Sequence, residues 1–260
     1  MSTPPLCSAG DAMLTLAEPK QSAGIDPDIA VRCTGIVKEF GTGDTRIRVL
    51  HGIDVEIGTG AMTYIVGPSG CGKTTLISVI AGILSAEAGE VEVFGRRLST
   101  LSGSRLARFR AETIGFIFQQ FNLLPALTAT ENASVPLLVN GVSEAVANRK
   151  ARDLLAAVGL EKHLDKFPAE LSGGQQQRVA IARALVHEPR LVISDEPTAS
   201  LDASAGQSVM EILRDHALAS DRAVIVVTHD NRIFHFADRI VRMSDGRITG
   251  IDLPPFVEAH

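Results

Sequence analysis

Residues 67–75 constrain the fold of this 260-residue chain more than any other stretch, because they read GPSGCGKTT. The apolar residues 64–66 come before them and predict a buried strand, and residues 76–81 after them predict a helix. A glycine-rich loop with this spacing, between a strand and a helix, presents backbone N–H groups and the positive end of the helix dipole to an anion. The sequence therefore predicts a phosphate-binding loop within an α/β fold.

The residues of this loop have distinct expected roles. Lys73 can reach the β- and γ-phosphates of a nucleotide, and the Thr74 hydroxyl can ligate Mg²⁺. Cys71 beside the lysine predicts a thiol that reagents modify and that ATP protects. The other predicted nucleotide contacts are Gly67, Ser69, Gly70, Gly72 and Thr75. A plain glycine-rich turn is the alternative, and the loop alone does not name the reaction, since kinases, GTPases and motors share it.

Charge and cysteine content narrow the class of protein. A formal net charge of −5 and the absence of tryptophan argue against a broad nucleic-acid surface. Cys7, Cys33 and Cys71 are widely spaced with no C-x-x-C pair, which argues against a disulfide framework or zinc and favours a reducing compartment. No apolar stretch approaches the roughly 20 residues that cross a bilayer. Work at a membrane is therefore expected from the cytoplasmic side, through a partner.

The pattern along the chain predicts how it is divided. Residues 1–28 are rich in Ser, Ala, Pro and Gly and are predicted to be a disordered leader before a domain at 29–260. Alternating segments between residues 30 and 95 predict a small antiparallel β subdomain. The apolar run 114–118 predicts a central strand. Helical periodicity over about 122–186 predicts a helical subdomain, and the strand–helix alternation that follows predicts a parallel α/β core.

Two carboxylates follow the apolar run at residues 191–193. Ligands collect at the carboxyl ends of strands in an open parallel sheet, which is where Asp195 and Glu196 fall. Asp195 is expected to hold Mg²⁺ through water, and Glu196 to polarise a water aimed at the γ-phosphate. An ordinary polar strand end is the alternative, which the phosphate loop in the same chain disfavours.

Residues 171–178 read LSGGQQQR, and here the chain resembles the ATP-binding cassette (ABC) ATPases, whose signature motif is LSGGQ. Other motifs of that family occur in the expected order: Gln119 matches the Q-loop, residues 200–202 match the D-loop, and His229 matches the switch histidine. The resemblance covers about residues 29–251. It implies a P-loop NTPase (RecA-like) core with an antiparallel β subdomain and an inserted α-helical subdomain.

The signature also reads as an anion site in its own right. Ser172 is a good helix N-cap, and two glycines expose N–H groups at a helix start. The resemblance implies that two copies dock head to tail, so that each signature caps the γ-phosphate on the other's loop. The residues assigned to that role are Ser172, Gly173, Gly174 and Gln175. A solvated helix start is the alternative.

The resemblance further implies an ATPase that uses ATP and Mg²⁺. Glu196 would be the general base, and His229 would contact the γ-phosphate and orient the attacking water, with Lys73 in the catalytic set. Gln119 would reach Mg²⁺ or that water, and Asp202 would support the dimer interface. Phe40 falls where the family carries an aromatic that stacks on adenine, with a core phenylalanine as the alternative.

Residues 41–46 and 114–124 resemble the branch that serves macrolide export and lipoprotein release, and residues 228–233 followed by 237–240 are most similar to DevA-type exporter ATPases. This implies a peripheral subunit on the cytoplasmic face of the inner membrane, whose expected partners are a permease and a periplasmic adaptor and not nucleic acid. Export or lipid and lipoprotein extrusion would be the activity. The alternatives are a soluble ABC ATPase acting on DNA or the ribosome, and a regulator of cell-wall remodelling that transports nothing.

Overall fold

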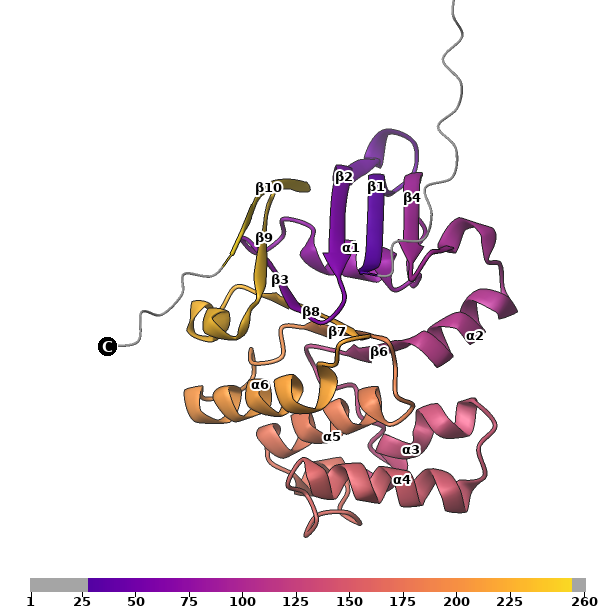
Figure 1. Ribbon diagram of the computed structural model, residues 1–260, viewed down its shortest axis with the longest axis vertical. Helices are drawn as coiled ribbons and strands as arrows, with labels where there is room; N and C mark the ends of the chain where they lie inside the picture. Colours follow the sequence, from indigo (N-terminus) through magenta and orange to yellow (C-terminus); the bar gives the residue numbers. More distant parts are fainter. Residues whose placement is uncertain (1–27, 254–260) are drawn as a thin grey trace, which may run out of the picture.

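Two β-sheets and six α-helices make up residues 28–253, the part of the chain that the computed structural model describes (Figure 1). The predicted leader, residues 1–28, lies outside the described residues except for its last position. None of the helices within residues 28–253 has the length and hydropathy of a membrane span.

The smaller sheet has four antiparallel strands in the order β2-β1-β4-β5. Strict alternation places Ile53, Val55 and Ile57 in the core while the residues between them face solvent, which is the pattern of a half-buried strand. The strands are β1 (Ile29–Phe40), β2 (Ile47–Gly58), β4 (Ala88–Val93) and β5 (Arg96–Arg97).

The larger sheet has six strands in the order β10-β9-β3-β8-β7-β6, all parallel except β10. Its central strands are buried on both faces, so they read as continuous apolar runs. The strands are β3 (Met62–Val66), β6 (Ile114–Ile117), β7 (Leu191–Asp195), β8 (Ala223–Thr228), β9 (Arg239–Ser244) and β10 (Arg247–Asp252).

The prediction of a central strand at residues 114–118 is wrong in one respect, because β6 is the edge strand of the larger sheet. It is apolar because a helix covers it. A Cβ added at Gly115 would lie 2.2 Å from the carbonyl oxygen of Ala184, which belongs to α5 (Gly173–Leu185). The close helix thus shields the strand, and apolar content alone does not separate a covered edge from a centre.

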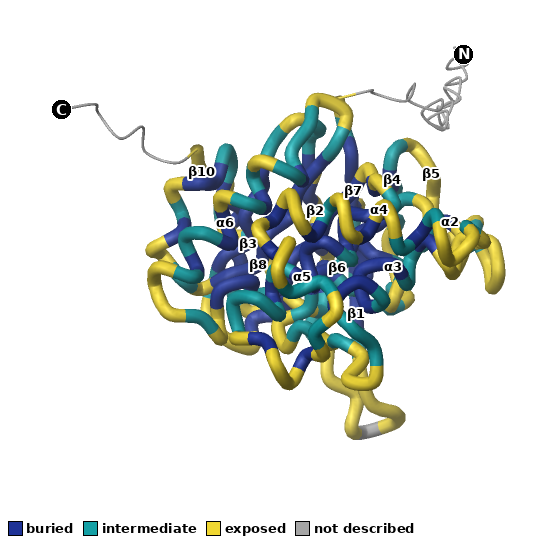
Figure 2. Tube along the Cα trace, turned by 90° about the horizontal axis from the view of Figure 1, so that it is seen from below, coloured by how far each residue is buried: buried dark blue, intermediate teal, exposed yellow. Residues whose placement is uncertain are grey.

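Two hydrophobic cores lie on opposite faces of the larger sheet. Within β8, Ile225 and Val227 belong to the core shared with the smaller sheet and α1 (Lys73–Ile80), whereas Val224 and Val226 belong to the core shared with α6 (Ala203–Ala217). In Figure 2 the buried residues lie in the middle of the molecule and the exposed residues lie around them.

A third core joins the helices that lie farthest from the smaller sheet in Figure 1. These are α3 (Ala129–Val139), α4 (Glu144–Ala157) and α5, all within the predicted 122–186 range. Helix α5 contributes to two cores. Val179 and Ala182 belong to this third core, whereas Ile181 and Ala184 belong to the core that the larger sheet shares with α6. Helix α5 therefore links the core of α3 and α4 to the core of the larger sheet. One further helix, α2 (Ser104–Thr113), precedes β6.

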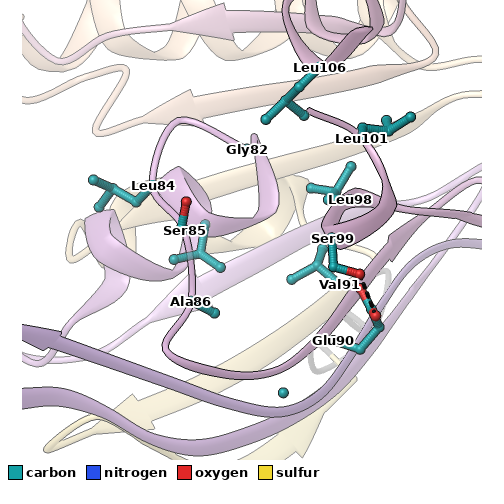
Figure 3. A pocket seen from close by; sticks show the side chains of 12 residues that line it. Gly82, Leu84, Ser85, Ala86, Glu90, Val91, Leu98, Ser99, Leu101 and Leu106 are labelled. Atoms are coloured by element: carbon teal, nitrogen blue, oxygen red, sulfur yellow. Dashed lines mark hydrogen bonds between the residues drawn. The ribbon is translucent and has the colours of Figure 1, made fainter. Parts of the chain in front are cut away.

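A cavity of about 200 Å³ opens between the α1–β4 connection and the segment that leads into α2 (Figure 3). Its wall is largely apolar, with Leu84, Val91, Leu98 and Leu106 among its residues, and Ser99 donates a hydrogen bond to a carboxylate oxygen of Glu90, at 2.7 Å. None of the predicted site residues lines it.

Candidate active site

The phosphate loop connects β3 to α1, and its glycines are required by its geometry. Gly67 has φ +156°, and a Cβ there would lie 2.0 Å from the carbonyl oxygen of Met243 on β9. Gly72 caps α1 in the left-handed region at φ +100°, a conformation that L-residues rarely adopt. The loop therefore packs closely against β9. The N-terminus of α1 follows the loop directly, where its N–H groups suit an anion.

Lys73 is almost buried, at 6% exposure, although it carries a charge. Its Nζ donates to the carbonyl oxygens of Gly67, at 2.8 Å, and Pro68, at 2.9 Å. These two bonds hold the ammonium against the inside of the loop.

A cleft of about 240 Å³ collects all four predicted catalytic residues. It brings together the ends of β3, β6, β7 and β8, which all finish at the same edge of the sheet. The residues that line it are Val49, Ser69, Gly70, Gly72, Lys73, Thr74, Thr75, Gln119, Glu196 and His229. Val49, on β2, was not predicted, since an apolar strand residue has no chemical signal of its own.

The structure argues against the predicted reactivity of Cys71. Its side chain is 5% exposed and packs into the core between the two sheets, and its Sγ lies 4.0 Å from the Nζ of Lys73. A reagent has little access to a thiol in that position. The predicted nucleotide contact of Cys71 stays a prediction, and it would have to be made by the backbone.

Asp195 ends β7 inside the same edge, at 6% exposure. The Thr74 hydroxyl donates to its Oδ1, at 3.3 Å. Burial raises the pKa of the Asp195 carboxyl, and the nearby Glu196 charge adds to this. Oxygen donors from Thr74 and Asp195, with Gln119 in the adjoining cleft, are the set that Mg²⁺ prefers, so these residues fit that ion.

Replacement of Asp195 by asparagine is expected to stabilise the nucleotide-free protein at pH 7. The folded chain holds the Asp195 proton at higher pH than the unfolded chain does, so stability falls as pH rises above about 4. Asparagine keeps an acceptor for Thr74 and removes the buried charge. We expect a higher melting temperature than wild type at pH 7, and a smaller difference near pH 4. The exposed Asp215→Asn variant is the control, and an equal gain there contradicts the explanation.

Glu196 and His229 form a hydrogen-bonded pair, with 2.8 Å between Oε1 and Nδ1. Glu196 has φ +49°, and its N–H donates to the carbonyl oxygen of Val227 on β8, at 2.9 Å. A non-glycine residue in this region is strained, and such strain concentrates at functional sites. The carboxylate side chain is 11% exposed and the imidazole 60%, so the pair reaches from the sheet edge to the mouth of the cleft.

The signature lies outside this cleft. Ser172 caps α5: its Oγ accepts from the Gln175 N–H, at 3.4 Å, and its own N–H donates to the Gln175 side chain, at 3.0 Å. A Cβ at Gly173 would lie 3.6 Å from Leu201, and Gly174 follows it in the first turn. Asp202 caps α6, accepting from the Ala205 N–H, at 2.9 Å. Within one chain, then, signature and D-loop are neighbours, and neither lines the phosphate-loop cleft.

The Q-loop segment, residues 119–122, leaves β6 and reaches toward the helices. Phe121 and Asn122 are both left-handed, with φ +54° and +49°. Arg183 of α5 donates to their carbonyl oxygens, at 2.6 and 2.5 Å, and burial lowers the pKa of its guanidinium. Sequence reasoning missed Arg183, because an arginine within a helix carries no signal for backbone contacts 61 and 62 residues earlier.

Phe40 is the last residue of β1 and is 42% exposed, so the alternative of a core phenylalanine is wrong. Its register partner is Ile47, also exposed, and two residues further along β2 is Val49 of the cleft. The Nζ of Lys38 lies 5.3 Å from the centre of the Phe40 ring. An exposed aromatic on the strand pair that leads into the cleft is suited to stacking on a base.

A phosphate loop after β3, paired acids after β7 and a histidine after β8, on one edge of a parallel sheet, define a P-loop NTPase. The chain belongs to the ABC transporter family, whose model matches residues 50–199. The fold is that of an ATP-binding cassette.

Relatives and solved structures agree with this assignment. The chain is 44% identical to the lipoprotein-releasing system ATP-binding protein LolD 1 of Caulobacter vibrioides, over 84% of this chain and 94% of that one. It is 39% identical to the macrolide export ATP-binding/permease protein MacB of Marinobacter nauticus, over 88% of this chain and 36% of that one. A dimeric post-hydrolysis structure of the cassette MJ0796 bound to ADP and Pi matches with TM-score 0.79 and 35% identity, covering 86% of this chain and 98% of that one.

These similarities confirm the predicted branch of lipoprotein release and macrolide export. The narrower similarity to DevA-type ATPases stays a prediction. The chain spans 64% of the length of mycobacterial ABC transporter ATP-binding proteins that it matches at 41% identity.

Proposed function

We propose that the chain is the ATP-hydrolysing subunit of an ABC transporter, and that a head-to-tail dimer couples ATP binding and hydrolysis to movement of a membrane permease. The observation that carries this proposal is the Glu196–His229 pair, held at 2.8 Å in the cleft that also contains Lys73 and Thr74. An acid–histidine pair beside a phosphate loop is an arrangement for activating water against a γ-phosphate.

Each residue of the cleft then has one task. The loop N–H groups, the α1 N-terminus and the Lys73 ammonium hold the β- and γ-phosphates. Glu196 accepts a proton from the attacking water. His229 donates a hydrogen bond from its Nδ1 to the Glu196 carboxylate, and its ring faces the γ-phosphate. Thr74, Asp195 and Gln119 hold Mg²⁺, which when bound neutralises phosphate charge.

The second copy completes the site. Ser172, Gly173, Gly174 and Gln175 lie at the start of α5, where N–H groups and the helix dipole suit an anion, yet they do not line their own chain's cleft. A head-to-tail dimer places them on the partner's γ-phosphate, with Asp202 of the adjoining D-loop at the interface and Phe40 against the adenine. The dimeric MJ0796 structure supports this proposal.

A groove of about 230 Å³ offers the permease a docking place between α2, β6, α3 and α5. Val139 lines it at 71% exposure, beside Leu138 at 41%. Arg183 also lines it while bonding the Q-loop carbonyls, so an occupant of the groove is one side chain away from the segment that begins at Gln119. We infer that α3, α4 and α5 move together and transmit the nucleotide state to the permease.

The names of the relatives guide the remaining parts of the proposal. LolD 1 is named for lipoprotein release and MacB for macrolide export, which favours extrusion of a lipid, lipoprotein or small molecule. The chain would then lie on the cytoplasmic face of the inner membrane as a peripheral subunit, with a periplasmic adaptor as a further partner.

Capture of the partner tests the proposal. Tagged wild type, Val139→Glu and the control Ile251→Glu, which makes a similar exchange on exposed β10, are purified with ATP from detergent-solubilised membranes of the native organism. We expect wild type and Ile251→Glu to recover a polytopic membrane protein, and Val139→Glu to recover roughly 10-fold less with ATPase activity intact. Recovery of ribosomes, nucleic acid or only soluble proteins overturns the transporter proposal.

A further inference from the structure

Gln177 of α5 is a buried amide without partners. The residue is 1% exposed, and neither its nitrogen nor its oxygen has a hydrogen-bond partner anywhere in residues 28–253. Its helix neighbours Gln175, Gln176 and Arg178 are all hydrogen-bonded. Native proteins keep few buried polar groups unpaired, because each such group destabilises the fold. The phosphate-site chemistry described above gives Gln177 no role.

The position of Gln177 on α5 shows what it faces. One turn earlier, Gly173 lies against Ser200 and the Phe121 ring, with its Cβ position 3.7 Å from the Ser200 carbonyl oxygen. One turn later, Ile181 packs in the same core as Ile117, the last residue of β6. Residues four apart share a helix face. Gln177 therefore lies on the face of α5 that is turned toward the D-loop, the Phe121 ring of the Q-loop segment and the core that contains the end of β6.

That segment is held in a strained conformation. Phe121 and Asn122 are consecutive left-handed residues, and neither is glycine. Arg183 donates hydrogen bonds to the carbonyl oxygens of both residues, and the Phe121 ring also lies against Gly173 at the start of α5. A strained backbone whose carbonyl oxygens are bonded to a single arginine can exchange those bonds for others in a second arrangement.

We propose that Gln177 is a positioning residue whose amide bonds to the backbone of the Q-loop segment, residues 119–122, when ATP closes the dimer. The unpaired amide disfavours the present conformation, and the new bonds fix the signature helix relative to Gln119 in the closed one. The nucleotide state in the cleft thus reaches the signature of the same chain. This inference rests on the proposed function, because it assumes an ATP-closed dimer.

The test replaces Gln177 by methionine, which has similar length and no hydrogen-bonding amide. Without nucleotide, we expect the melting temperature to rise by about 2 °C or more, since an unpaired buried amide is removed. With ATP, we expect kcat to fall about 10-fold, because the bonds made in the closed state are lost. ATP-driven dimerisation in a Glu196→Gln background weakens to a similar extent, and nucleotide affinity of the monomer stays within about twofold of wild type.

Gln207→Met on α6 is the matched control, because this glutamine already bonds His235 at 3.1 Å and lies far from the Q-loop in sequence. It is expected to show neither the rise in melting temperature nor the fall in kcat. If Gln177→Met has a lower melting temperature and a proportional loss of activity, Gln177 has a structural role only, and the proposal is overturned. Unchanged kcat and dimerisation overturn it as well. If wild type itself neither dimerises with ATP nor hydrolyses it, the proposed function is what fails.

Discussion

Replacing Glu196 by glutamine is expected to lower kcat for ATP hydrolysis by ~10²–10⁴-fold, the usual effect of losing a positioned general base. The Glu196 side chain is 11% exposed and its carboxylate is hydrogen-bonded to His229. The backbone of Glu196 is in the left-handed region, and its N–H donates to the Val227 carbonyl oxygen. Glutamine keeps that shape and removes the basic oxygen. ATP binding should be retained, so that ATP-closed dimers accumulate, as measured by size-exclusion chromatography with light scattering.

Glu188→Gln is the matched control for this experiment. Glu188 is also a left-handed glutamate, at φ +56°, but its side chain is exposed and pairs with Lys150 on the surface. The kcat of the Glu188→Gln variant should remain within about twofold of wild type, because exposed ion pairs contribute little to stability. Normal turnover by Glu196→Gln would show that another group activates the water.

Replacing Lys73 by alanine is expected to weaken ATP binding by roughly 100-fold or more, because charge-assisted bonds to two phosphate groups are lost. In contrast to Glu196→Gln, affinity and turnover should fall together. The substitution also removes the hydrogen-bond donor to the Gly67 and Pro68 carbonyl oxygens, so two bonds that stabilise the loop are lost. Titration with a fluorescent ATP analogue measures the affinity.

Lys150→Ala serves as the control for Lys73→Ala, since it removes a half-exposed lysine from a surface ion pair. Its affinity for the analogue should match that of wild type. Thermal unfolding of both variants without nucleotide separates a lost phosphate contact from a collapsed loop. Retention of wild-type affinity by a folded Lys73→Ala protein would contradict the assignment of the phosphate loop.

The local parts of the site could be predicted because each rests on a short stretch of chain. Lys73 bonds the carbonyl oxygens of Gly67 and Pro68, and the Ser172 cap bonds Gln175, so each acts through residues no more than six positions away. Their geometry follows from backbone preference and hydrogen bonding over a few positions. The paired acids were predictable for a similar reason, since a buried strand that ends in Asp195 and Glu196 delivers both to a sheet edge.

The rest depended on contacts between distant segments. The Cys71 thiol was expected to react, yet the fold turns its side chain into the core. Arg183 and Gln177 carry no motif that assigns them these positions, and they matter because α5 passes beneath a loop that lies some 60 positions earlier. Apolar content likewise could not distinguish the covered edge strand β6 from a central one.

The sequence by itself determined the phosphate loop, the acids beside it, the signature helix start and the α/β class, because spacing and periodicity are properties of the chain alone. Only the tertiary structure decided that Glu196 touches His229, that the signature stays out of its own cleft, and that Gln177 remains unpaired. Each of these depends on how strands and helices far apart in sequence pack against one another. Packing is selected by the whole core and not by any local pattern.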